Sequence, residues 1–229
     1  MLAGDTNIDT LVQQGCHIWN DWAYKNYVSQ QDENLPYLQM SGFKDAIRRD
    51  EDFANRFGDL GPIYGKQWRD WNGVDQLQIA VEQIQRTPAS RRIIIEGWNV
   101  PELFKMALPP CHKTYQFTVR GNKLDLTVQQ RSCDMFLGVP FNIANAGLML
   151  ALMAKTCDLK ADKLHWFGVN CHIYSNHKEQ VNTILGRDAP QSLPKLLIEP
   201  HVDIFNCTID DVMIDGYDPN EAIAAPVAV

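Results

Sequence analysis

The sequence lacks the patterns that mark several large classes of protein. Its six cysteines include no CxxC or CxxH spacing, so neither a structural zinc site nor a disulfide framework is indicated. The most apolar stretch, 147–154, is too short to span a bilayer, and the N-terminus has no basic segment followed by an apolar one. These absences predict a cytoplasmic protein with no metal site, no secretion signal and no membrane segment.

Basic residues are outnumbered as well. The chain has 21 Lys and Arg against 28 Asp and Glu, which gives a formal net charge of −7. This balance argues against dedicated nucleic-acid binding, so an anionic small molecule would have to be attracted by local arginines. At 229 residues the chain is long enough for one sizeable core, and we expect a single domain over 1–229.

The hydrophobic pattern predicts an α+β protein. In chain order, we expect helices at 8–15, 43–57, 77–88, 142–157 and 175–185. The first of these is expected to be capped by Asp5 or Thr6. Strands are expected at 93–95, 115–119, 123–129 and 164–168. The polar segment 28–57 is expected to be a peripheral insertion with little part in the chemistry.

A cysteine and an arginine are expected to meet at the open end of a hairpin. The strands 115–119 and 123–129 turn at Gly121 and Asn122, so Cys111 and Arg131 lie just beyond their outer ends. A thiol is a useful nucleophile at neutral pH when a cation favours its thiolate. Arg131 with Ser132 also suits a phosphate. Taken alone, a free cysteine is more often a buried apolar residue, and an Arg-Ser pair is usually a surface feature.

Two further polar groups suit a nucleotide. The Asn142 amide both donates and accepts, as the imide edge of uracil requires, whereas an aspartate would suit cytosine. His172 and Tyr174 are separated by one residue at a strand end, so both can point to one side and bond a ribose hydroxyl. A lone histidine is more often a structural donor than a catalyst.

Short segments that are typical of one enzyme family follow one another along the whole chain. They are GDTNI (4–8), IWNDWA (18–23), GDLGPIYGKQWR (58–69), SRRIII (90–95), WNVPELFKMALPPCH (98–112), RSCDMFLGVPFNIA (131–144), HIYSNH (172–177), LPKL (193–196), GYDP (216–219) and APVAV (225–229). On these segments the chain resembles the thymidylate synthase family.

The resemblance implies a fold and a reaction. The fold is a large mixed β-sheet flanked by helices, with the sheets of two subunits packed together in a homodimer. The reaction is the reductive methylation of dUMP to dTMP, with 5,10-methylenetetrahydrofolate as donor of both the carbon and the hydride. The Cys111 thiolate would add to carbon 6 of the uracil ring, after which carbon 5 attacks the methylene group of the folate. No metal is implied.

The resemblance also assigns roles to residues. The catalytic roles fall on Cys111, Tyr64, Arg131 and Asp134, with Tyr64 assisting proton transfer at carbon 5. The dUMP contacts fall on Arg91, Arg92, Gln130, Arg131, Ser132, Cys133, Asp134, Asn142, His172, Ile173 and Tyr174. Of these, Arg91 and Arg92 would reach the phosphate bound by the partner subunit. The contacts to reduced folate fall on Trp19, Trp22, Asp134, Leu137, Gly138, Phe141 and Ala228, and Val229 would close over the site.

The residue types alone leave two of these assignments open. Trp19 and Trp22 also fit a pair of core aromatics. Arg91 and Arg92 also fit a solvated surface pair.

The chain departs from the family's pattern in places. Met1 falls where the family has the end of a helix, so a preceding segment with a phosphate-binding arginine and a glutamate is expected to be absent. Departures within the shared region occur at Gln129, Val169, Asn170, Asn220 and Ala224.

Two alternatives to thymidylate synthase follow. They are a dUMP hydroxymethylase of the same superfamily, and a truncated paralogue that binds dUMP without turning it over. Retention of Trp19 and Trp22 favours the synthase over the hydroxymethylase, because bulky aromatic rings exclude water from the reacting methylene group.

Overall fold

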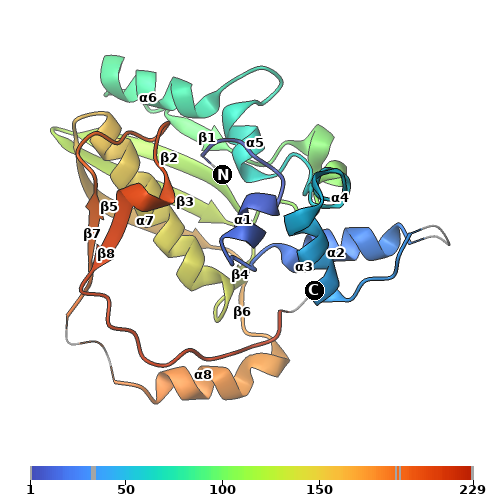
Figure 1. Cartoon of the computed structure of the whole chain (residues 1–229). Helices are drawn as coiled ribbons and strands as arrows, with labels where there is room; N and C mark the ends of the chain where they lie inside the picture. The colour runs from blue at the N-terminus through green and yellow to red at the C-terminus, as the bar shows by residue number, and fades with distance from the viewer. Residues whose placement is uncertain (1, 32–34, 189, 191, 228–229) are drawn as a thin grey trace. The chain divides into compact units, whose positions relative to one another are not determined.

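The computed structural model describes residues 2–31, 35–188, 190 and 192–227 (Figure 1). The chain divides into two compact units. The first unit comprises residues 1–76 and 96–110, and the second comprises 77–95 and 111–228. The expected single domain over 1–229 stays a prediction.

The first unit is built from short helices. They are α1 (Asp9–Gln13), α2 (Asn20–Ser29), α3 (Met40–Arg49), α4 (Glu51–Phe57), α5 (Tyr64–Arg69) and the 3₁₀ helix η1 (Val100–Lys105). The expected capping of the first helix is wrong in detail. The Asn7 side chain accepts a hydrogen bond from Asp9 N, and Asp5 caps the turn before it by accepting from Asn7 N. Gly15 follows the helix at a φ of 72°, a conformation that favours glycine.

Aromatic side chains from segment 28–57 and from α2 form the core of this unit. Tyr27, Phe43 and Phe57 are at most 1% exposed. The Tyr27 ring centroid lies 5.1 Å from that of Phe57 and 5.4 Å from that of Phe43. The segment therefore contributes to the core of the first unit. Its interpretation as an insertion stays a prediction.

The single helix expected over 43–57 is two helices in the structure. Asp50 has extended backbone angles, and its side chain accepts a hydrogen bond from Phe53 N at 2.9 Å. The aspartate therefore ends α3 and caps α4. The run Asp50-Glu51-Asp52 is a usable signal for such a start, since acidic side chains favour the first turn of a helix.

A four-stranded mixed sheet dominates the second unit. Its strands, in the order β1 (Ile94–Glu96), β2 (His112–Arg120), β3 (Lys123–Gln130) and β5 (Lys160–Gly168), lie side by side. The β2–β3 pair is antiparallel and the β3–β5 pair is parallel. The predicted hairpin is confirmed, with Gly121 at a φ of 62° in its turn. The expected mixed sheet flanked by helices is also confirmed (Figure 1).

Helix α7 (Gly138–Thr156) lies across one face of this sheet (Figure 1). Side chains alternate along β3, so Leu124, Leu126 and Val128 share one face and are at most 1% exposed. Gln130 continues this buried series at the end of the strand. The opposite face is exposed at Gln129 and at Phe167 of β5. The alternation therefore places Gln130 on the side of the sheet that α7 covers.

Several elements differ in their bounds from the prediction. Helix α7 begins at Gly138 rather than 142, because Pro140 falls in its first turn, where a missing N–H costs nothing. Strand β5 begins at Lys160 rather than 164, since Lys160 and Ala161 pair with β3 although their residue types are not strand-like. The helix expected at 175–185 is the 3₁₀ turn η2 (Ser175–His177) followed by α8 (Lys178–Leu185).

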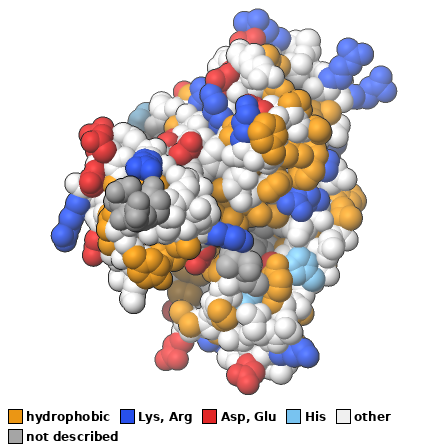
Figure 2. All heavy atoms as spheres, turned by 90° about the vertical axis from the view of Figure 1, so that its right-hand side faces the viewer, with side chains coloured by type: hydrophobic (Ala, Val, Ile, Leu, Met, Phe, Trp, Pro, Cys, Tyr) orange, Lys and Arg blue, Asp and Glu red, His pale blue; other side chains and the backbone are white. Residues whose placement is uncertain are grey.

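The rest of the second unit is peripheral to this sheet. Helix α6 (Gln76–Arg86) begins at the boundary between the two units and shows the predicted buried stripe of Leu77, Ala80, Val81 and Ile84. The remaining elements are β4 (Cys133–Asp134), β6 (Cys171–His172), β7 (Lys195–Ile198), η3 (Ile209–Asp211) and β8 (Val212–Asp215). Figure 2 shows acidic, basic and apolar side chains together on the face in view.

Candidate active site

Cys111 and Arg131 meet at the open end of the β2–β3 hairpin. Arg131 N donates a hydrogen bond to Cys111 O at 2.8 Å, next to the paired residues His112 and Gln130. Both Cys111 and Arg131 are half-buried. The hairpin therefore brings together the backbones of the two residues that sequence analysis singled out, as expected.

A chain of side-chain hydrogen bonds begins beside this pair. Trp166 Nε1 of β5 donates to Gln130 Oε1 at 2.9 Å, and Gln130 Nε2 donates to Asn142 Oδ1 of α7 at 2.8 Å. An indole N–H can only donate, so it fixes which end of the Gln130 amide is oxygen. The Gln130 nitrogen in turn fixes which end of the Asn142 amide is oxygen. Sequence analysis missed Trp166, because its partner depends on the strand register.

The short parallel pair β4–β6 brings Asp134 and His172 together. The two residues are partners in register, and Met135 N donates to His172 O at 3.0 Å. Asp134 Oδ1 also accepts from Phe136 N and Leu137 N. The Asp134 carboxylate therefore orders the turn that leads into α7.

Asn170 determines the orientation of the His172 ring. His172 Nδ1 lies 3.2 Å from both the backbone oxygen and the side-chain oxygen of Asn170. A carbonyl oxygen only accepts hydrogen bonds, so Nδ1 carries the hydrogen and Nε2 of a neutral ring presents its lone pair. The Tyr174 ring stands edge-on to His172, with centroids 4.9 Å apart. The two side chains therefore lie next to each other, and their expected bonds to a ribose hydroxyl stay a prediction.

Three sequence-predicted residues gather in the first unit. The ring centroid of Trp19 lies 5.5 Å from that of Trp22 and 5.9 Å from that of Tyr64. Tyr64 is 3% exposed and has a φ of 23°. A positive φ is costly for a bulky residue and persists where the surroundings enforce it, which is common at functional sites. The tryptophans are half-buried, so they are partly accessible to a ligand.

The other predicted residues vary in exposure. Arg91 and Arg92 are exposed on the segment before β1, and Phe141 is 62% exposed on the first turns of α7. Cys133 is fully buried, and Ile173 is 51% exposed. Ser132, Leu137 and Gly138 are half-buried. Ala228 and Val229 lie outside the described residues.

Burial shifts the pKa of two groups that lie close to Cys111 and Arg131 in the sequence. It lowers the pKa of His112 to about 4, so this imidazole is neutral at pH 7. His112 Nδ1 lies 2.9 Å from Tyr115 Oη. Burial, together with the interaction of its S–H with the Cys171 sulfur, raises the pKa of Cys133 to about 11. A neutral histidine beside Cys111 supplies no positive charge.

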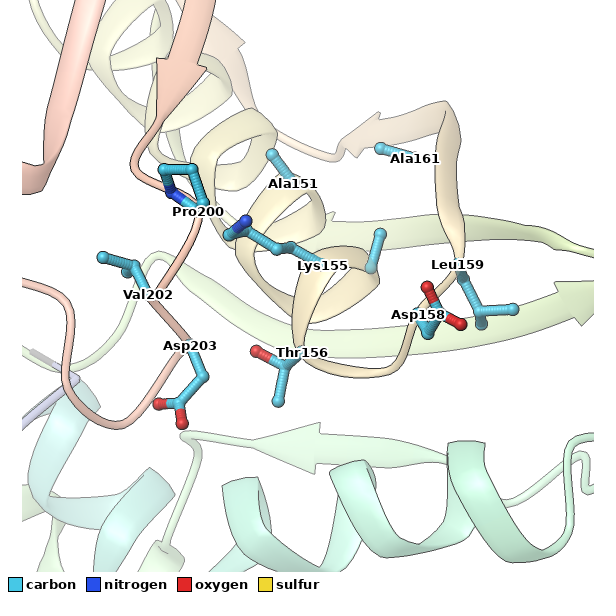
Figure 3. A pocket seen from close by; sticks show the side chains of 10 residues that line it. Ala151, Lys155, Thr156, Asp158, Leu159, Ala161, Pro200, Val202 and Asp203 are labelled. Carbon is cyan, nitrogen blue, oxygen red and sulfur yellow. The ribbon is translucent and has the colours of Figure 1, made fainter.

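A separate hollow of about 560 Å³ lies near the C-terminal end of α7 (Figure 3). Its lining includes Lys155, Thr156, Asp158 and Asp203, and none of the sequence-predicted residues is among the ten that line it. Across the described ranges, no three His, Cys, Asp or Glu side chains gather so as to hold a metal ion. None of the helices in the described part of the chain has the length and apolarity needed to cross a membrane.

Comparison with known proteins gives consistent matches. The thymidylate synthase family profile matches residues 1–229. The thymidylate synthase of Novosphingobium aromaticivorans is 44% identical over 244 residues, covering 100% of this chain and 76% of that protein. That of Rhizorhabdus wittichii is 43% identical over 244 residues, covering 100% and 78%. That of Mycoplasma pneumoniae is 44% identical over 229 residues, also covering 100% and 78%.

Proposed function

The chain belongs to the thymidylate synthase family of methyltransferases, and on that premise we propose that it methylates dUMP reductively to dTMP with Cys111 as nucleophile. 5,10-Methylenetetrahydrofolate supplies the carbon and the hydride. The observation that carries the proposal is the hydrogen bond from Arg131 N to Cys111 O at 2.8 Å. It holds a thiol and a guanidinium-bearing residue at the same end of the hairpin.

Arginine activates the thiol in this proposal. A thiolate needs a neighbouring cation, and His112 is neutral at pH 7 because burial lowers its pKa to about 4. Arg131 therefore supplies positive charge near Cys111 and binds the nucleotide phosphate through the paired N–H groups of its planar guanidinium. Cys111 adds to carbon 6 of the ring, and its sulfur leaves again when the product forms, so the cysteine is regenerated.

The fixed amides support uracil as the base. The Asn142 oxygen accepts from Gln130 Nε2 at 2.8 Å and has a second lone pair for the imide N–H of uracil. The Asn142 nitrogen then donates to a uracil carbonyl. His172 Nε2, whose lone pair is set by Asn170, accepts from a deoxyribose hydroxyl. Tyr174 bonds the same sugar.

Aromatic side chains suit the reduced folate. The exposed Phe141 ring and the Trp19–Trp22 pair offer flat apolar surfaces, and the Asp134 carboxylate offers an acceptor for the pterin. Tyr64 assists proton transfer at carbon 5. The tryptophans exclude water from the exocyclic methylene group, so that this carbon accepts a hydride from tetrahydrofolate rather than a hydroxyl group from water.

A homodimer completes the proposed site. The face of the sheet opposite α7 exposes Phe167, which is 60% accessible, and an exposed apolar side chain on an open sheet face suits packing against a second sheet. In a twofold dimer, Arg91 and Arg92 of each subunit serve the phosphate site of the other. Light scattering that shows only monomer at micromolar concentration, with dUMP still bound tightly, would contradict this part of the proposal.

Turnover tests the function directly. Purified protein is incubated with dUMP and methylenetetrahydrofolate, dihydrofolate is followed by absorbance, and the nucleotide product is identified by chromatography. We expect dTMP with an equal amount of dihydrofolate. 5-Hydroxymethyl-dUMP would identify a hydroxymethylase, and tight dUMP binding without product would identify a non-catalytic paralogue.

Cys111→Ser is the matched test of the nucleophile. An alcohol has no accessible anion at neutral pH, so the variant should bind dUMP but lose turnover. Wild type incubated with 5-fluoro-dUMP and methylenetetrahydrofolate should give a stable covalent adduct in the peptide that contains Cys111. Cys207→Ser serves as the control and should retain the adduct. An adduct mapped to another cysteine refutes the assignment.

A further inference from the structure

Cys133 and Cys171 face one another across the β4–β6 pair. They are partners in register in a parallel ladder, so their side chains point to the same side. Neighbouring strands lie about 4.8 Å apart, and a disulfide forms when the two Cα atoms are about 4.4–6.8 Å apart. The backbone therefore already holds the two cysteines at a distance that a disulfide can bridge.

The two sulfur atoms converge on the same end of the neighbouring sheet. Cys133 Sγ lies 3.7 Å from Gln130 O. A Cβ atom added to Gly168 would lie only 2.7 Å from Cys171 Sγ, so this sulfur packs directly over the glycine. Gln130 and Gly168 are themselves partners in the β3–β5 ladder. The Cys171 side chain is also close enough to Cys133 to raise the pKa of its thiol.

The two cysteines differ in accessibility. Cys171 is exposed, whereas Cys133 is fully buried. A dissolved oxidant therefore reaches Cys171 first, and the adjacent Cys133 is shielded from direct attack. This is the arrangement of a peroxidatic thiol beside a resolving thiol.

We propose that Cys133 and Cys171 are a site of reversible oxidation that closes to an intrachain disulfide in the presence of a hydroperoxide. The Cys171 thiolate attacks the peroxide and becomes a sulfenic acid, and the peroxide leaves as hydroxide. The Cys133 sulfur then attacks the sulfenic sulfur and loses its proton, and the hydroxyl group leaves as water. Two thiols are oxidised and one hydroperoxide is reduced; a dithiol reductant reverses the bond by exchange.

The cross-link lies directly before two residues of the candidate active site. Asp134 follows Cys133, and His172 follows Cys171. Closing the bond ties these two strands together, because a disulfide draws the paired Cβ atoms to about 3.8 Å. The oxidation itself requires no turnover. Its mapping is therefore independent of the proposed function.

The test uses the full chain and hydrogen peroxide. Oxidised protein is alkylated, digested without reductant and analysed by mass spectrometry. We expect a linked pair of peptides containing Cys133 and Cys171, lighter by two hydrogen atoms than the two reduced peptides together, and lost after dithiothreitol. Unlinked Cys133 and Cys171 peptides, alkylated as fully as without peroxide, would overturn the proposal. So would a bond from either residue to Cys111.

Variants separate the pair from general oxidation. Cys171→Ala, at an exposed position, should abolish the linked peptide while the protein stays folded by circular dichroism. Cys207→Ser is the matched control and should leave the linkage unchanged. Cys133→Ser should leave Cys171 as a sulfenic acid that a dimedone probe labels. Persistence of a linked species in Cys171→Ala would refute the pairing.

Discussion

Trp166→Phe tests how the base-reading amide is held in place. Trp166 Nε1 donates to Gln130 Oε1 at 2.9 Å, and Gln130 is only 1% exposed. Phenylalanine keeps an aromatic ring but removes the donor. Gln130 then keeps a buried oxygen without this hydrogen bond, and we expect the free energy of unfolding to fall by about 1–3 kcal/mol.

The substitution should also weaken base discrimination. Without the indole N–H, the orientation of the Gln130 amide depends only on Nε2, which donates to Asn142 Oδ1 and to Ser132 O at 3.0 Å, so the turned-over amide becomes easier to populate. Its oxygen would then face Asn142 Oδ1, and the Asn142 amide would lose its fixed orientation. One hydrogen bond is worth about 0.5–1.5 kcal/mol net, so the preference for dUMP over dCMP should fall by about 2- to 12-fold.

Calorimetric titration with both nucleotides and urea denaturation measure the two effects. Trp71→Phe, at another half-buried tryptophan, is the control for loss of an indole. Unchanged dUMP preference in Trp166→Phe, together with a loss of stability, would mean that Trp166 is structural and that Asn142 is oriented by other contacts. Unchanged stability and preference would refute the whole chain of hydrogen bonds.

Three further predictions address the base, the pH response and a helix start. Asn142→Asp should shift preference toward dCMP and weaken dUMP binding by about 1–3 kcal/mol, because a carboxylate cannot donate to a uracil carbonyl; an unchanged preference would show that something else reads the base. His112 stays neutral in the folded chain down to a pKa of about 4 but titrates at 6.5 when unfolded, so the unfolded chain binds the extra proton between these values. Stability should therefore be full above pH 6.5 and fall by up to about 3 kcal/mol toward pH 4, and His112→Gln should flatten this part of the profile of urea midpoints; equal slopes in both proteins would contradict it. Asp50→Ala removes the acceptor for Phe53 N and should cost about 0.5–2 kcal/mol in thermal unfolding, whereas Asp45→Ala on α3 should cost less; equal losses would argue against the cap.

Local signals in the sequence predict local parts of the fold. Gly121-Asn122 between two alternating runs predicts the hairpin, and that hairpin alone brings the backbones of Cys111 and Arg131 together. Periodicity also predicts the buried stripe of α6. Hydrophobic periodicity does not predict the break at Asp50, because the apolar spacing continues through 43–57. Only the capping side chain of Asp50 shows that a new helix begins there.

Contacts between distant segments depend on register, which residue types alone do not determine. Trp166 reaches Gln130 because β5 returns parallel to β3 with Val128 opposite Trp166 and Gln130 opposite Gly168. Moving β5 by one residue would turn Trp166 to the opposite face of the sheet. Nothing in the run Lys163 to Gly168 reveals which alignment is chosen.

The same dependence on register joins the candidate active site to the proposed redox pair. One ladder, β4–β6, sets Cys133 opposite Cys171 and Asp134 opposite His172, so any change in its alignment would alter both pairs together. A variant in which this ladder is misaligned should therefore lose both the disulfide and the contact between His172 and the deoxyribose. Cys171→Ala leaves the backbone hydrogen bonds of β6 in place, so it should lose only the disulfide. If Cys171→Ala loses the disulfide but still binds dUMP, the redox pair and the nucleotide site share one ladder but act separately, because the Cys171 thiol can be removed without moving the His172 imidazole beside it.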